Sequence, residues 1–145
     1  MAELKIVIAE DNPLMMELLS SILEEEDGFL VVGKADNGED AYQMIMEKSP
    51  DLVLLDVIMP KLDGISVLEK VRAARSGKNM PAVIIVSAAG NETVASAAFR
   101  NGASYYILKP FDREILLDKI HLVAEERIRA KTVSVVREKP AETYF

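Results

Sequence analysis

The chain has 145 residues, of which 50% are hydrophobic and 28% charged, with a formal net charge of −7 and no cysteine. This composition is typical of one soluble globular domain with a short tail, and it excludes disulfides, thiolate metal sites and cysteine nucleophiles. The acidic balance disfavours broad nucleic-acid binding by this segment, because the phosphates would be repelled.

The sequence also predicts a cytoplasmic location and no membrane association. No apolar run approaches the roughly 18 residues of a membrane-spanning helix. The first residues lead directly into a strand-like run, without the charged, apolar and small-residue sections of a secretory signal.

Residues 4–9 are a short β-branched apolar run, which predicts a strand that stops at Glu10 and Asp11. Asn12 and Pro13 then predict the N-cap and first residue of a helix, which a stretch of acidic residues closes. The residues expected on the buried face of this helix are Met15, Leu18, Leu19 and Ile22.

A second strand is expected over residues 30–35, followed by a short helix between an Asn-Gly pair and a Ser-Pro pair. Residues 52–55 are continuously apolar, as in a strand that is covered on both faces, and this strand ends at Asp56.

Beyond the third strand, a helix is expected between Gly64 and Arg75. Residues 82–86 predict a fourth strand that closes at Ser87, and residues 92–100 are a weaker, alanine-rich helical segment.

The last strand is expected over residues 105–108, ending at Lys109, and Asp112 caps the last helix. The residues expected to point inward from this helix are Ile115, Leu116, Ile120 and Val123. Helical periodicity fades after about Arg127. We therefore interpret residues 1–126 as one domain and 127–145 as a helix end with a linker or tail.

Five strands that alternate with five helices predict an α/β fold with a parallel, doubly wound sheet. Parallel neighbours need crossover connections, and right-handed crossovers place helices on both faces. Of the two common doubly wound strand orders, the short flavodoxin-like order 2-1-3-4-5 suits five strands.

Polar side chains follow the last apolar residue of four predicted strands: Glu10 and Asp11, Asp56, Ser87, and Lys109. The carboxyl ends of parallel strands share one edge, so these groups are expected to converge. Clustered carboxylates stay ionised together only if a cation offsets them. Mg²⁺ suits such an open oxygen site, and Ca²⁺ or Mn²⁺ could take its place.

Asp11 and Asp56 are the expected direct ligands of the cation, with Glu10 acting through water. A carboxylate beside a metal can attack phosphorus, so Asp56 is the candidate for an aspartyl phosphate. Lys109 would then bind one phosphoryl oxygen and the Ser87 hydroxyl another.

Each residue also has an ordinary alternative. The acidic pair could be a solvated loop favoured by the helix dipole, Asp56 a turn residue, and Lys109 a surface ammonium. The coincidence of these groups at four separate strand ends favours phosphoryl-transfer chemistry.

Four stretches are diagnostic in combination: residues 8–12, residues 54–60 with Asp63-Gly64, residues 86–88 and residues 102–111. Over residues 4 to about 126 the chain resembles the response-regulator receiver family of two-component signalling. It departs from the commonest pattern at Glu10, where many members carry Asp, and at Ser87, where Thr is frequent.

The resemblance implies that Asp56 is the phosphoacceptor. The metal ligands that it implies are Glu10, Asp11, Asp56 and the backbone carbonyl of Ile58. It further implies Ser87 as the switch hydroxyl, Tyr106 as the switch aromatic, and Lys109 as the family's lysine, followed by a cis bond to Pro110.

The family's partners are implied in the same way: a histidine kinase or phosphorelay phosphotransferase as donor, and a surface that dimerises or binds an effector after phosphorylation. Residues 57–64 and 102–112 are especially similar to sporulation regulators of endospore-forming Firmicutes. That likeness implies a transcriptional output through a DNA-binding domain after the linker, with no direct DNA contact by this segment. Catalysis is expected only of the domain's own phosphorylation and dephosphorylation.

Three other functions are alternatives for a chain of this pattern. A phosphohydrolase with an aspartyl intermediate usually needs a second acid two residues after the nucleophile, where Ile58 stands. A flavin-binding module should carry a Ser/Thr-rich loop after the first strand, which is acidic here. A stand-alone receiver that acts only through protein–protein interaction is the remaining alternative.

Overall fold

The residues that the computed structural model describes, 3–75 and 77–136, form five strands that alternate with five α-helices. The strands are β1 (Leu4–Ala9), β2 (Phe29–Ala35), β3 (Leu52–Leu55), β4 (Ala82–Ser87) and β5 (Tyr105–Leu108). The helices are α1 (Pro13–Glu24), α2 (Gly38–Lys48), α3 (Gly64–Ala74), α4 (Glu92–Arg100) and α5 (Arg113–Val136), with a short 3₁₀ helix, η1 (Gly77–Asn79).

The strands form one parallel sheet in the order β2-β1-β3-β4-β5, which confirms the predicted fold class. The register pairs Ala9 with Leu55, Leu55 with Ile85, and Ile85 with Tyr106. The carboxyl ends of all five strands therefore lie along one edge of the sheet, as the convergence of the polar groups requires.

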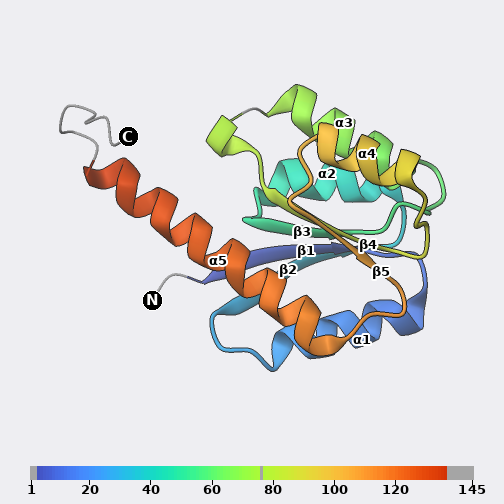
Figure 1. The fold of residues 1–145 in the computed structure, drawn as a ribbon, viewed down its shortest axis with the longest axis horizontal. Coiled ribbons are helices and arrows are strands. Elements are labelled where there is room, and N and C mark those ends of the chain that lie inside the picture. Colours follow the sequence, from blue (N-terminus) through green and yellow to red (C-terminus); the bar gives the residue numbers. More distant parts are fainter. Residues whose placement is uncertain (1–2, 76, 137–145) are drawn as a thin grey trace.

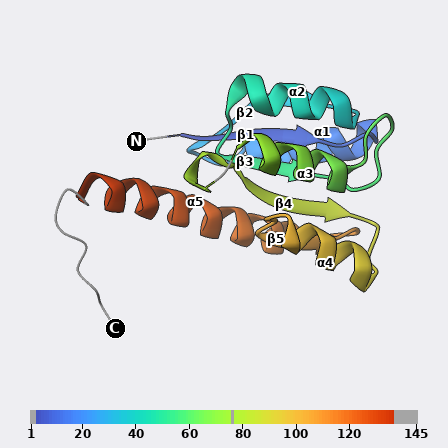
Figure 2. The ribbon, with the colours of Figure 1, turned by 90° about the horizontal axis from the view of Figure 1, so that it is seen from above.

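Helices cover both faces of the sheet. Helices α1 and α5 lie on one face and α2, α3 and α4 on the other (Figures 1 and 2). Alternate residues of β1 and β3 enter two cores: Ile8 and Leu54 pack toward α1 and α5, and Val7 and Val53 toward the other three helices. Every residue of β3 is buried, as its continuous apolar run predicted.

Four helices begin at the carboxyl edge with a side-chain cap. In each case the side-chain oxygen accepts a hydrogen bond from the backbone amide three residues further along the chain. The capping residues are Asn12, Asn37, Asp63 and Asn91, with N···O distances of 3.0, 2.9, 3.0 and 2.9 Å. Each such cap stabilises its helix by about 1 kcal/mol and fixes where the preceding loop enters it.

Two residues predicted on buried helix faces are exposed. Leu18 of α1 is 47% exposed and Ile115 of α5 is 51% exposed. The neighbouring Leu19 and Leu116 are buried instead. On both helices the apolar residues span a wider arc than the sheet covers. Helical periodicity alone therefore assigned residues at the border of this apolar face to the core.

Helix α5 continues past residue 126 to Val136. In Figures 1 and 2 its C-terminal part extends beyond the end of the sheet. The remainder of the predicted linker, residues 137–145, lies outside the described residues. Across the described part of the chain, no helix has the length and hydrophobicity required to cross a membrane.

Candidate functional site

Three carboxylates meet where β1 and β3 end. Glu10 and Asp11 follow β1, Asp56 follows β3, and each contributes an oxygen that lies within 4.8 Å of the others. Glu10 is only 1% exposed and Asp56 4%, whereas Asp11 is exposed to solvent. The predicted convergence of the acidic residues is therefore confirmed, with two of them inside the protein and one at its surface.

Lys109 joins the two buried carboxylates. Its ammonium Nζ lies 2.5 Å from Glu10 Oε1 and 2.8 Å from Asp56 Oδ2. The lysine leaves β5 at a point where its backbone amide donates to the Ser87 carbonyl, and the bond to Pro110 is cis as predicted. One positive charge is thus shared by two negative ones.

The other oxygen of each buried carboxylate accepts a backbone hydrogen bond. Glu10 Oε2 accepts from the Asn12 amide at 3.0 Å, and Asp56 Oδ1 accepts from the Ile58 amide at 3.0 Å. Both acids are therefore held in a fixed orientation from two sides, by Lys109 and by the loop that follows each strand.

The two buried carboxylates share one ammonium, which affects the pKa of Glu10 and of Lys109 differently. Burial raises the pKa of Glu10, and its hydrogen bonds to Lys109 and to the Asn12 amide only partly offset that rise. For Lys109, burial lowers the pKa, but the hydrogen bonds and negative charges of Asp56 and Glu10 outweigh burial and leave the pKa raised. The lysine gains from both acids, while Glu10 receives only a share of one ammonium.

Ser87 and Tyr106 meet at the backbone of Ala89. The Ser87 hydroxyl is fully buried and accepts a hydrogen bond from the Ala89 amide at 3.2 Å, and the Tyr106 hydroxyl donates to the Ala89 carbonyl. Burial raises the pKa of the half-buried Tyr106, and the charge of Asp56 raises it further. Both residues thus hold the loop between β4 and α4 rather than the carboxylates.

The donor set suits a hard divalent cation. Three carboxylate oxygens this close repel one another, and a single ammonium compensates only part of their charge. An oxygen-only, partly open arrangement is what Mg²⁺ or Ca²⁺ prefers. The acidic group can therefore bind a metal ion. Ile58 lies next to Asp56 with its side chain 58% exposed, and the role of its carbonyl as a ligand stays a prediction.

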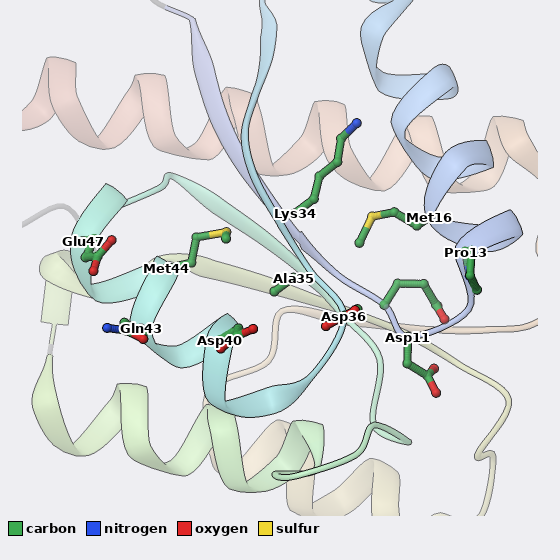
Figure 3. A pocket seen from close by; sticks show the side chains of 11 residues that line it. Asp11, Pro13, Met16, Lys34, Ala35, Asp36, Asp40, Gln43, Met44 and Glu47 are labelled. Carbon is green, nitrogen blue, oxygen red and sulfur yellow. The ribbon is translucent and has the colours of Figure 1, made fainter.

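An acidic cavity of about 680 Å³ opens beside the site, between α1 and α2 (Figure 3). Glu10 and Asp11 line it, but Asp56, Ser87 and Lys109 do not. The other charged residues of its lining are Lys34, Asp36, Asp40 and Glu47. The excess of carboxylates would raise the local concentration of cations in this cavity, which Asp11 lines.

Sequence reasoning missed the part played by Ala89, because an alanine gives no signal for a backbone role. It also missed the apolar surface around the site. Leu14 is 77% exposed on the first turn of α1, and Leu108 is 51% exposed at the end of β5. With Ile58, which is 58% exposed, they leave apolar surface uncovered near the carboxylates.

The chain matches a known protein family and several solved structures. The family model of the response regulator receiver domain matches residues 6–121. The signal receiver domain of NarL from Mycobacterium tuberculosis is 29% identical with a TM-score of 0.79, over 86% of this chain and 98% of that one. The CheX-CheY-BeF3-Mg complex from Borrelia burgdorferi gives 29% identity and a TM-score of 0.76, over 84% and 90%. A DNA-binding response regulator of the LuxR family from Staphylococcus aureus gives 29% and 0.75, over 82% and 97%.

Proposed function

Because the chain belongs to the response regulator receiver family, we propose that Asp56 accepts a phosphoryl group from the phosphohistidine of a histidine kinase or phosphorelay phosphotransferase. The observation that carries this proposal is the setting of Asp56. Its carboxylate is buried, hydrogen-bonded to Lys109 and to the Ile58 amide, and grouped with two further carboxylates. A lone turn residue would need none of these contacts.

Glu10, Asp11, Asp56 and the backbone carbonyl of Ile58 would hold Mg²⁺, or Ca²⁺ or Mn²⁺ in its place. The bound cation would neutralise negative charge on the phosphoryl oxygens during transfer. An Asp56 oxygen forms the new bond to phosphorus as the bond from phosphorus to the donor imidazole breaks, and the electron pair leaves with the imidazole. The Lys109 ammonium, already 2.8 Å from the Asp56 carboxylate, would then form its ion pair with a phosphoryl oxygen.

The exposed apolar side chains near the site support a protein as the donor. Leu14 and Leu18 are exposed one turn apart on α1, and Ile58 is exposed beside Asp56. A partner that presents a phosphohistidine could bury these side chains while it brings phosphorus to the carboxylate.

Phosphorylation would change the contacts around Ala89. Our hypothesis is that Ser87 turns from the Ala89 amide to a phosphoryl oxygen, which frees one of the two side-chain hydrogen bonds that hold the loop before α4. Tyr106 would move with that loop and alter the face formed by α4, β5 and α5. Phe99 and Ile115 are exposed on this face, where a homodimer or an effector could bind.

We further propose a transcriptional output of the sporulation type, as in the stage-zero sporulation regulator that the sequence stretches resemble. Similarity to a DNA-binding response regulator supports an output of this kind. In this scheme residues 1–126 act as the receiver, residues 127–145 form the helix end and linker, and a following domain would bind DNA. The protein would act in the cytoplasm and catalyse only its own phosphorylation and dephosphorylation.

The test of the proposed function is the Asp56→Asn variant. Incubation of the purified protein with Mg²⁺ and a small acyl-phosphate donor should label the wild type, and D56N should lose essentially all labelling. The exposed Asp118→Asn on α5 is the control and should be labelled normally. Undiminished labelling of D56N in a hydroxylamine-sensitive form would remove Asp56 from the role.

A further inference from the structure

Residues 57–63, the part of the β3–α3 loop that follows Asp56, hold its carboxylate. The second of these residues, Ile58, donates the backbone hydrogen bond that Asp56 Oδ1 accepts at 3.0 Å. The path of this loop therefore decides how the carboxylate is turned and where the Ile58 carbonyl lies.

Lys61, in the middle of this loop, has a left-handed backbone with φ of 70°. A residue with a Cβ atom adopts this conformation at a cost of about 1–2 kcal/mol, and it persists where the surrounding structure enforces it. The Lys61 side chain is exposed, so its own packing does not supply that restraint.

Within the loop, the Leu62 amide donates to the Pro60 carbonyl at 2.8 Å, across Lys61. A second restraint comes from Gly38, the first residue of α2. Its amide donates a hydrogen bond to the Pro60 carbonyl at 3.2 Å. A Cβ atom at Gly38 would lie 1.8 Å from the Leu62 carbonyl oxygen and 2.5 Å from the Leu62 carbonyl carbon. Gly38 thus contacts the residues on both sides of Lys61, and only a residue without a side chain fits there.

Gly38 is itself fixed in place. The preceding Asn37 is buried and caps α2, and its side-chain amide donates to Asp36 and Asp40 at 2.9 and 2.8 Å. The far end of the loop is closed by Gly64, whose amide donates to the Val57 carbonyl at 2.8 Å. The loop is therefore held at one end by α3 and near its middle by α2.

We propose that Gly38 is a positioning residue for the phosphoacceptor site, acting through the strained loop to place Ile58 and the Asp56 carboxylate for cation binding. The inference rests on the proposed function, since it concerns the same site. Gly38 has no side chain that could bind a cation. It sets the geometry of the site by close approach of the α2 backbone to Leu62.

The first test compares Gly38→Ala with Gly33→Ala. A Cβ at Gly33 of β2 would meet the end of the flexible Met44 side chain, which can move aside, whereas at Gly38 it meets backbone. Calorimetric titration with Mg²⁺ alone should show affinity reduced about tenfold in G38A and nearly unchanged in G33A, as expected when outer contacts of a metal site are lost. In G38A the Ile58 amide resonance should also shift. Wild-type affinity in folded G38A, or equal losses in both variants, would overturn the proposal.

A second pair of variants covers the case in which G38A does not fold. Lys61→Gly and Lys61→Pro both remove the same exposed side chain, but glycine accepts φ of 70° and proline is locked near −65°. K61P should weaken Mg²⁺ binding about tenfold relative to K61G, because it forces the loop away from Gly38. Equal affinities in K61P and K61G would show that the loop conformation does not position the site.

The outcomes separate this inference from the proposed function. If the wild type neither binds Mg²⁺ nor accepts a phosphoryl group, the proposed function fails. If the wild type does both and the G38A and K61P variants bind Mg²⁺ as tightly as their controls, only the role of Gly38 fails.

Discussion

At the carboxyl edge of the sheet, buried carboxylates share one ammonium, whereas at the amino edge arginines bind backbone carbonyls. Arg75 donates to the Met46 carbonyl near the end of α2 at 2.9 Å, and Arg72 donates to the Arg100 carbonyl at the end of α4 at 2.6 Å. The helices of a parallel α/β fold end at the amino edge, where their last carbonyls carry partial negative charge. The two arginines donate hydrogen bonds to these carbonyls and so offset their partial negative charge.

The difference between the two edges separates stability from chemistry. At the amino edge Arg72 and Arg75 each meet an acceptor of opposite partial charge, so these contacts stabilise the fold. At the carboxyl edge Glu10 and Asp56 are buried with only Lys109 between them, and the negative charge left over favours a metal ion, which the proposed phosphoryl transfer requires. Substitutions at the two edges should therefore have different consequences.

The largest effect is expected for Lys109→Met. Labelling of Asp56 by a small phosphodonor should slow by about 100-fold, since one preorganised charge at the transferred group is lost. Without divalent cations the free energy of unfolding should fall by about 3 kcal/mol, because two buried carboxylates lose their counter-charge. Urea unfolding in EDTA and again with Mg²⁺ measures this, and Mg²⁺ should restore part of the loss.

The matched control is Lys48→Met, an exposed lysine in the last turn of α2. It should leave both the labelling rate and the response to Mg²⁺ unchanged. If the K109M protein is labelled at the wild-type rate, the proposal that charges at the carboxyl edge serve the chemistry is wrong.

Much of the fold could be predicted because local signals agreed with one another. The run at residues 52–55 predicted β3, and Asn12, the Asn37-Gly38 pair and Gly64 marked helix starts that the structure confirms. The exposure of Leu18 could not be predicted, since helical periodicity does not show how wide a contact the sheet offers. The extent of α5 was also missed, because the apolar residues of 127–136 do not recur at a regular helical spacing.

For the site, strand ends predicted which groups converge but not how they pair. That Glu10 is buried and shares Lys109 with Asp56 depends on side chains that are far apart in the sequence. The restraint of Lys61 by Gly38 is of the same kind, since an Asn-Gly pair reads as an ordinary turn until the opposing loop is seen. The chemistry could be read from residue types, and its positioning required the structure.

A smaller effect, confined to stability, is expected for Arg75→Met at the amino edge. The variant loses hydrogen bonds to the Met46 carbonyl and to the Ser49 hydroxyl, so the free energy of unfolding should fall by about 1 to 2 kcal/mol. Labelling of Asp56 should proceed at the wild-type rate. The exposed Arg129→Met on α5 should change neither quantity, and slower labelling of R75M would mean that the amino edge also serves the site.

The smallest effect is expected for Glu10→Gln and concerns the pH dependence of stability. Burial raises the pKa of Glu10 in the folded protein above its ordinary value of 4.5, so the folded state binds this proton more tightly than the unfolded state. The stability that this proton contributes is present below pH 4.5 and is lost as the pH rises through the raised pKa. Glutamine stays neutral, so the E10Q protein should gain stability relative to the wild type as the pH rises from about 4.5 to 7.

Urea unfolding in EDTA across this range measures the difference, with the exposed Glu47→Gln of the neighbouring cavity as control. The gain should be smaller than the loss in R75M, because Lys109 already offsets part of the burial of Glu10. A difference between E10Q and the wild type that stays constant or shrinks with rising pH would show that Lys109 fully compensates Glu10, and the contrast between the two edges would then lie in geometry and not in charge.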